Sequence, residues 1–205
     1  AWVEYVNQLG GIGGASNKLF KVSTADASCT ATAFSGGMQG FNEFGMGFVS
    51  NAAMSTDETL YIAGGDTVGG ASNLGTLDIN TFAITKGGAL TGDPELTGTG
   101  LGELWGFFPD LTGSTMQAHV AQIDKTSGAE SNMIALPSVA GQASSWAFAF
   151  YGGDYWVFLA KQNGATVVYH VTTMGGTQPV NQLDTMTRHI VGAGVSTCAP
   201  TTPIG

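Results

Sequence analysis

The pentapeptide GGASN occurs twice in this chain of 205 residues, at positions 13–17 and again at positions 69–73. Each copy follows an apolar, β-prone run and precedes a second such run, so the repeated element is strand, glycine-rich loop, strand. Glycine allows positive φ angles in such loops, and Ser and Asn side chains bond back to the local backbone. We interpret GGASN as the turn between the second and third strands of two equivalent repeats.

The pattern continues with less identity along the rest of the chain. Residues 103–129 and 154–177 are two further copies of run, loop and run. A short run of small and apolar residues precedes the second, third and fourth copies, at positions 44–51, 94–100 and 146–153. The first copy has no such run before it, but residues 189–198, HIVGAGVSTC, have the same character. A fourth short β-prone run ends each copy.

These repeats predict one all-β domain over residues 1–205. The turns are rich in Gly, Asn, Asp and Ser, and no helical periodicity is present over a useful length. Repeats of four short strands are typical of a β-propeller, so we expect a four-bladed β-propeller of four-stranded antiparallel blades. The predicted blades are blade 1 at 1–35 plus 188–198, blade 2 at 42–88, blade 3 at 93–137, and blade 4 at 144–184.

The C-terminal run is expected to close the ring. In this prediction residues 189–198 pair with the first strand, near residues 2–6, and remove two exposed sheet edges. Cys29 and Cys198 are the only cysteines. They flank the junction at one end of the closing blade, so we expect a disulfide between them in an oxidising compartment. Removal of residues 189–205 should then unfold or aggregate the domain.

Composition narrows the class of protein. Apolar residues make up 43% of the chain and charged residues only 10%, against a usual share of about 25%. With 32 glycines, this composition is typical of a β-rich protein that is secreted or displayed at the cell surface. The net charge of −9 disfavours nucleic acid as a partner, and no apolar run approaches the ~20 residues of a membrane span. The start at Ala1-Trp2 indicates a processed chain.

Several motifs carry a resemblance to known sequences. The segments FGMGFVS, PELTGTG, ELWGFFPD, WAFAFYGGDYWVF and VGAGVSTCAP resemble parts of secreted, uncharacterised propeller-like proteins of myxobacteria and related soil bacteria. The resemblance covers most of the chain, from Ala1 to Pro200. It implies secretion and a repeated β architecture. It implies no activity and transfers no site residues.

Binding is the function that this architecture favours. Propellers present repeated loops on one face, and aromatic side chains beside Asn and Asp are suited to saccharides. The candidate ligand-binding residues are Trp105, Asp110, Trp146, Tyr151 and Asp154. We expect an extracellular, non-catalytic binding or surface-matrix protein with carbohydrate or an extracellular protein as partner. Core packing between blades is the competing role for each tryptophan.

Other classes of function stay open at this stage. A secreted hydrolase would use loop carboxylates such as Asp57, Glu58, Glu103, Asp110 and Asp154, because glycosidases need two carboxyl groups at a set separation. A structural subunit of an extracellular assembly, formed by self-association, would fit the low charge and high glycine content.

Neither histidine chemistry nor a cofactor is predicted. His119, His170 and His189 show no catalytic or metal-binding spacing. Calcium is a minor hypothesis, because the loops at 64–70 and 92–95 offer carboxylates and carbonyl groups.

Overall fold

The computed structural model describes residues 1–5, 17–65, 71–113, 118–139, 141–162, 164–180 and 189–202. These residues form fifteen β-strands and two short 3-10 helices, η1 (Met38–Gly40) and η2 (Pro137–Val139). None of the helices in these ranges is long and apolar enough to cross a lipid bilayer. The predicted all-β class is confirmed.

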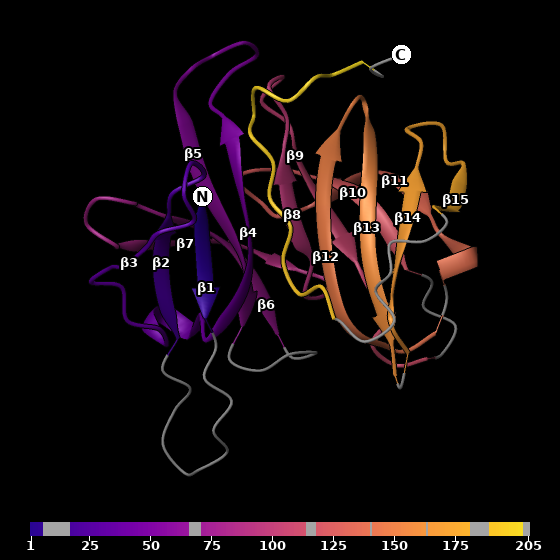
Figure 1. The fold of residues 1–205 in the computed structure, drawn as a ribbon, viewed down its shortest axis with the longest axis horizontal. Helices are drawn as coiled ribbons and strands as arrows, with labels where there is room; N and C mark the ends of the chain where they lie inside the picture. The colour runs from indigo at the N-terminus through magenta and orange to yellow at the C-terminus, as the bar shows by residue number, and fades with distance from the viewer. Residues whose placement is uncertain are drawn as a thin grey trace.

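The strands form four antiparallel sheets, each from a consecutive stretch of chain, and strands that are neighbours in sequence are neighbours in the sheet (Figure 1). Sheet 1 contains β1 (Trp2–Tyr5), β2 (Lys18–Val22) and β3 (Cys29–Ala31). Sheet 2 contains β4 (Glu43–Ser50), β5 (Glu58–Gly65), β6 (Ser72–Leu77) and β7 (Ile84–Leu90). Sheet 3 contains β8 (Glu95–Gly98), β9 (Leu104–Phe108), β10 (His119–Ile123) and β11 (Glu130–Ala135). Sheet 4 contains β12 (Ala143–Tyr151), β13 (Asp154–Lys161), β14 (Thr166–Val171) and β15 (Thr177–Val180).

One six-residue turn recurs in sheets 1, 2 and 3 at positions 23–28, 78–83 and 124–129. In each copy the N–H of the first residue donates to the carbonyl of the last, over 2.9–3.0 Å. The N–H of the fifth residue donates to the carbonyl of the first, and the fifth residue has a positive φ. This turn joins the last two strands of sheets 2 and 3, and it joins β2 to β3. The three strands of sheet 1 therefore correspond to the second, third and fourth strands of the other sheets.

The first strands of sheets 2, 3 and 4 lie in the middle of the molecule, with β8 between β4 and β12 (Figure 1). Glycine makes the approach of β4 and β8 possible. A Cβ on Gly45 would overlap the carbonyl oxygen of Pro94, and a Cβ on Gly98 would overlap that of Phe48. Since residue 45 lies beside residue 94 and residue 48 beside residue 98, β4 and β8 run in the same direction.

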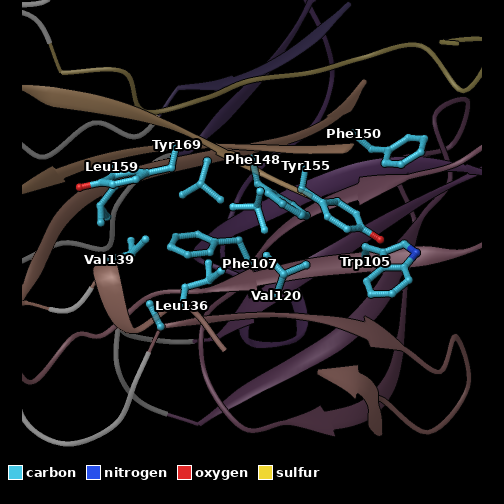
Figure 2. Packing of buried hydrophobic residues seen from close by; sticks show 13 residues of the cluster. Trp105, Phe107, Val120, Leu136, Val139, Phe148, Phe150, Tyr155, Leu159 and Tyr169 are labelled. Carbon is cyan, nitrogen blue, oxygen red and sulfur yellow. The ribbon is translucent and has the colours of Figure 1, made fainter. Parts of the chain in front are cut away.

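Three apolar cores join successive sheets. Leu19, Phe44 and Leu60 belong to the core between sheets 1 and 2, and Val49, Leu74 and Leu96 to the core between sheets 2 and 3. Figure 2 shows the third core, in which side chains such as Phe107 and Phe148 pack between sheets 3 and 4. Within the described ranges, no comparable core joins sheet 4 to sheet 1.

The C-terminal segment, residues 189–202, forms no strand. Its N–H and carbonyl groups contact sheet 4, where Ile190 N donates to Thr166 Oγ1 over 2.9 Å and Pro200 O accepts from Gly152 N over 2.9 Å. The Thr197 hydroxyl donates to Glu58 in sheet 2. This segment contacts sheets 2 and 4, and no strand of the described chain pairs with the free edge of β1.

The predicted Cys29–Cys198 disulfide is wrong. Both residues are free and exposed. Cys29 opens β3, the edge strand of sheet 1 that matches the outer strands of the other sheets, whereas Cys198 lies in the C-terminal segment near the inner strands. An inner and an outer strand are separated by three strand spacings of ~4.8 Å, and a disulfide needs Cα atoms closer than ~7 Å.

The two GGASN loops lie largely outside the described residues. Asn17 directly precedes β2, and Ser72 and Asn73 open β6. Each pentapeptide therefore ends at the start of the equivalent third strand, but the equivalence of the loop conformations stays a prediction.

Candidate functional site

Three glutamates from three sheets gather at one end of the central strands. Glu4 lies in β1, Glu43 is the first residue of β4, and Glu95 is the first residue of β8. The N–H of Phe44 donates to Glu4 Oε2 over 3.2 Å, and the N–H of Met46 donates to the carboxyl of Glu95. These two N–H groups lie on the free edge of β4, because β5 occupies its other edge. Carboxylates thus satisfy a sheet edge that no strand covers.

Burial and mutual repulsion perturb all three acids. Burial is the main reason that the pKa of Glu4 rises from 4.5 to about 7, and the charge of Glu43 raises it further. Hydrogen bonds from Phe44 and Asn17 lower this pKa but do not offset the rise. Burial also raises the pKa of Glu95 well above its usual value, and the charges of Glu4 and Glu43 contribute. The pKa of Glu43 rises through burial and the nearby Asp93. This cluster can therefore hold protons near neutral pH, as a general acid does.

A metal site is not formed by the described residues, in which no group of three or more His, Cys, Asp or Glu side chains is arranged to hold an ion. The calcium hypothesis named two loops. Residues 66–70 of the first lie outside the described ranges. Asp93 and Glu95 of the second lie at the glutamate cluster, and in the described residues they form no such group.

The five predicted ligand-binding residues do not form one site. Trp105, Tyr151 and Asp154 lie at one end of sheets 3 and 4, because Leu104 pairs with Gly98 at the end of β8, and Tyr151 pairs with Asp154. Asp110 lies at the other end, where its carbonyl accepts from Ala143 N at the start of β12. Trp146 is also near that start. The five residues are therefore divided between opposite ends of sheets 3 and 4.

Both predicted tryptophans pack in the core of sheets 3 and 4 rather than on an open platform. Trp105 is 8% exposed, packs on Tyr155 at 5.0 Å between ring centroids, and donates its indole N–H to Glu103 (Figure 2). Trp146 is partly buried against the same core. Both tryptophans therefore pack against the core between sheets 3 and 4, as the competing interpretation expects.

The two predicted aspartates are engaged in local structure. Asp110 is buried and accepts hydrogen bonds from the N–H groups of Thr112 and Gly113. Burial raises the pKa of Asp110, but these hydrogen bonds outweigh it, so the pKa is lowered. Asp154 accepts from His170 Nε2 at 2.8 Å. Neither carboxylate is placed to act on a substrate together with the other.

Two histidine–carboxylate pairs occupy third strands of adjacent sheets. His119 in β10 lies 2.8 Å from Glu130 of β11 and stacks on Phe108, whereas His170 in β14 lies 2.8 Å from Asp154 of β13 and stacks on Trp156. The stacking on a ring of the second strand recurs in both sheets, but the carboxylate comes from a different strand in each. His189 Nδ1 lies 3.4 Å from Ser145 Oγ, and in the described residues no carboxylate completes a triad there.

A second feature lies at the opposite end of the central strands from the glutamates. One large apolar side chain is exposed in or directly beside each turn between the first and second strands of sheets 2, 3 and 4: Met54 is 90% exposed, Leu101 53%, and Tyr151, the last residue of β12, 44%. The turns of sheets 2 and 3 touch, because Met54 N donates to Gly100 O over 2.8 Å. The C-terminal segment connects this area to the turn of sheet 4 through Pro200. We call Met54, Leu101 and Tyr151 the apolar turn face.

Sequence reasoning missed the glutamate cluster. Glu4, Glu43 and Glu95 each stand in or at the edge of an apolar β-prone run, in WVEY, EFGMG and ELTG. An acid within such a run is the signal that could have found them, because strand interiors seldom carry unpaired carboxylates.

Comparison with models of known protein families finds no match, and comparison with curated proteins finds no similar protein. Any function for this chain therefore rests on its own residues and their geometry.

Proposed function

We propose that this chain is an extracellular, non-catalytic binding or surface-matrix protein, built as a four-bladed β-propeller, with a carbohydrate or an extracellular protein as its partner. Four successive antiparallel sheets, three of which have their first strands in the middle, support the propeller. The C-terminal segment runs beside β12 in the same direction, since His189 lies by Ser145 and Pro200 by Gly152. It thus lies where an inner strand of sheet 1 would complete the ring.

The apolar turn face is the observation that carries the proposal of binding. Met54, Leu101 and Tyr151 come from equivalent turns, and exposed apolar groups gathered on one face indicate an interaction site. Tyr151 offers an aromatic ring for a sugar or an apolar side chain.

Secretion is supported by composition and by the resemblance of the motifs, and the free cysteines add nothing to it. A chain with only 10% charged residues and 32 glycines fits an exported β protein.

The test compares the chain with a variant in which Met54, Leu101 and Tyr151 are all changed to Ser. We expect the unmodified chain to bind members of a glycan array or to self-associate, as measured by light scattering, and the triple variant to lose that binding. Met133→Ser removes a methionine that is 59% exposed on the outer strand β11 and serves as the matched control. Equal binding by all three proteins would exclude the turn face as the site.

A hydrolase is the second candidate, and the glutamate cluster is the observation that favours it. Glu4, with a pKa of about 7, could donate a proton while a neighbouring carboxylate acts as base. Turnover of polysaccharide substrates that disappears in Glu4→Gln and Glu95→Gln would favour this function over binding alone.

A further inference from the structure

Each contact between successive sheets, which we call a joint, is built from two sets of side chains. At the joint between sheets 3 and 4, one set comes from sheet 3 and includes Trp105, Phe107 and Val120. The other set comes from the facing side of sheet 4 and includes Val157 and Val171. Because the sheets repeat, the same two sets can be sought where sheet 4 would meet sheet 1.

Sheet 4 repeats the first set on the face that points away from sheet 3. Ile123 and Val171 end the third strands of sheets 3 and 4, so counterparts are found by counting back from these two residues. The counterparts are Trp156 for Trp105, Phe158 for Phe107 and Val168 for Val120. In the described residues none of these counterparts belongs to a core, and Trp156 and Phe158 are partly exposed. We call the three counterparts the outer face of sheet 4.

Sheet 1 carries the second set. Leu19 belongs to the core with sheet 2, and Glu4 faces sheet 2 as well, where it accepts from Phe44. Side chains alternate along a strand, so the opposite face, which we call the free face of sheet 1, carries Val3, Tyr5, Phe20 and Val22. In the described ranges these four residues belong to none of the three cores. Both halves of a fourth joint are therefore present in the chain.

The free edge of β1 lies beside this free face. Ala1 and Val22 exchange two backbone hydrogen bonds, of 2.7 and 2.8 Å. Hydrogen bonding alternates along an antiparallel strand, so the N–H and carbonyl groups of Trp2 and Glu4 point away from β2. These groups are the ones that a further strand of sheet 1 would bind.

The equivalent edge of sheet 2 is covered by β4. Counting back from the repeated turn, Leu19 corresponds to Leu74, and their partners in the preceding strands are Glu4 and Ala63. Ala63 in turn pairs with Gly45 of β4. A strand that covers β1 in the same way should therefore place a glycine opposite Glu4.

The C-terminal segment has glycines at the required spacing. Gly192, Gly194 and Thr197 follow one another at the same intervals as Gly45, Gly47 and Ser50 in β4. Hydrogen bonds of Ile190 and Thr197 anchor the two ends of the segment, while Val191 is 69% exposed. A Cβ on Gly192 or Gly194 would meet no atom within 4 Å, whereas the two glycines of β4 lie tightly against β8. The segment thus has the glycine spacing of an inner strand without its close contacts.

We propose that sheet 4, sheet 1 and the C-terminal segment form a clasp that closes the ring of sheets. In the closed clasp the free face of sheet 1 packs on the outer face of sheet 4, and the segment pairs with β1 so that Gly192 lies opposite Glu4 and Gly194 opposite Trp2. Burial of the two apolar faces drives closure. The other three joints do not change, so the clasp opens and closes without unfolding the chain. This inference rests on the propeller of the proposed function but not on what the chain binds.

Disulfide trapping tests the clasp in a chain whose two native cysteines are changed to Ser. In the proposed register Val3 lies opposite Ala193, as Ile62 lies opposite Met46 in sheet 2. Such a pair has Cα atoms ~4.5 Å apart, within the range of a disulfide. We expect Val3→Cys, Ala193→Cys to form a disulfide within one chain on mild oxidation, and to raise Tm by about 5–10 °C over the reduced form.

Thr30→Cys, Ala193→Cys is the matched control, because Thr30 is exposed on β3, the strand of sheet 1 farthest from β1. Three strand spacings of ~4.8 Å separate it from the segment in the closed clasp, so it should be trapped at least about tenfold more slowly. Adding Phe20→Ser to the trapping variant removes an apolar contact of the closed joint and should slow trapping at least about tenfold. Adding Met133→Ser, on the outer strand β11, should leave the rate within about twofold.

Trapping of the Val3–Ala193 pair no faster than the control pair would overturn the clasp. A disulfide between two chains would overturn it too, because the segment would then pair with a second copy. Matching far-ultraviolet dichroism of the reduced variants shows that slow trapping is not loss of fold. A chain that is trapped normally but binds nothing refutes the proposed binding alone, and one that binds but is not trapped refutes the clasp alone.

Discussion

At the scale of single residues, Glu4 shows how one side chain connects two sheets. It lies in sheet 1 and accepts a hydrogen bond from the Phe44 N–H of sheet 2. The charge of Glu43, also in sheet 2, raises the pKa of Glu4. Asn17, which is fully buried, donates to its other oxygen over 3.1 Å. The carboxyl is thus hydrogen-bonded but poorly solvated, and its protonated form is favoured in the folded chain.

Glu4 should make the folded chain more stable in mild acid than at pH 8. Its pKa is about 7 when folded and near 4.5 when unfolded, so the folded state binds the proton more tightly. The free energy of unfolding therefore falls as pH rises from about 4.5 to 7, by about 3 kcal/mol for this group, and is constant above that range. Thermal melts of Glu4→Gln at pH 5 and pH 8 should show a much smaller difference than those of the unmodified chain.

Asp57→Asn is the control for this experiment, because Asp57 is an exposed carboxylate in the β4–β5 turn. It should keep the full difference between pH 5 and pH 8. If Glu4→Gln keeps that difference too, Glu4 ionises normally in the folded chain.

At the scale of elements, two features define the arrangement of the sheets: a turn that is repeated in three of them, and the close contact between the central strands β4 and β8. The turns at 23–28, 78–83 and 124–129 have the same backbone hydrogen bonds although Ala27, Phe82 and Gly128 differ at the position with positive φ. The backbone conformation is therefore held by the hairpin as a whole. These shared hydrogen bonds show which strands of sheet 1 correspond to strands of sheets 2 and 3, although the residues of the three turns differ.

Gly98→Ala should destabilise the chain by about 3 kcal/mol. A methyl group there would overlap the Phe48 carbonyl, so β8 would have to move away from β4, and overpacking of this kind costs ~1–3 kcal/mol. Gly192→Ala is the matched control, because nothing lies within 4 Å of its added Cβ, and it should change stability by less than about 0.5 kcal/mol. Urea unfolding measures both. Equal stability of the two variants would mean that β4 and β8 are not in contact.

At the scale of the whole molecule, the described residues form three cores that hold four sheets together, and none of these cores includes a residue of the C-terminal segment. The segment is attached by hydrogen bonds of Ile190, Thr197 and Pro200 instead. Since apolar burial dominates stability, the sheets should persist without the segment.

A chain that ends at residue 188 should therefore keep its β-rich far-ultraviolet dichroism and unfold cooperatively, with Tm lower by several degrees. A loss of about 2 kcal/mol from the missing hydrogen bonds corresponds to ~4–8 °C for a domain of this size. Scanning calorimetry measures the change. An unfolded or aggregated product at 25 °C would support the earlier expectation from sequence, that this segment closes the ring.

Much of the architecture could be predicted from local pattern. Alternating apolar runs with Gly, Asn and Asp between them define short antiparallel strands, because adjacent hairpins need only turn chemistry and a two-residue period. The runs at 44–51 and 146–153 correspond to β4 and β12, and four sheets follow in chain order.

Other features depend on contacts between residues far apart in the chain, and only the tertiary structure decided them. The apolar run at 189–198 resembles an inner strand but forms none: Ile190 N donates to the Thr166 hydroxyl of sheet 4, and the Thr197 hydroxyl donates to Glu58 of sheet 2. Cys198 does not meet Cys29. Glu4, Glu43 and Glu95 are separate acids in the sequence and become one cluster because three sheets meet at their ends. Strand formation is decided by neighbouring residues, whereas the place of a chain end and the pKa of a carboxyl depend on which sheets pack together.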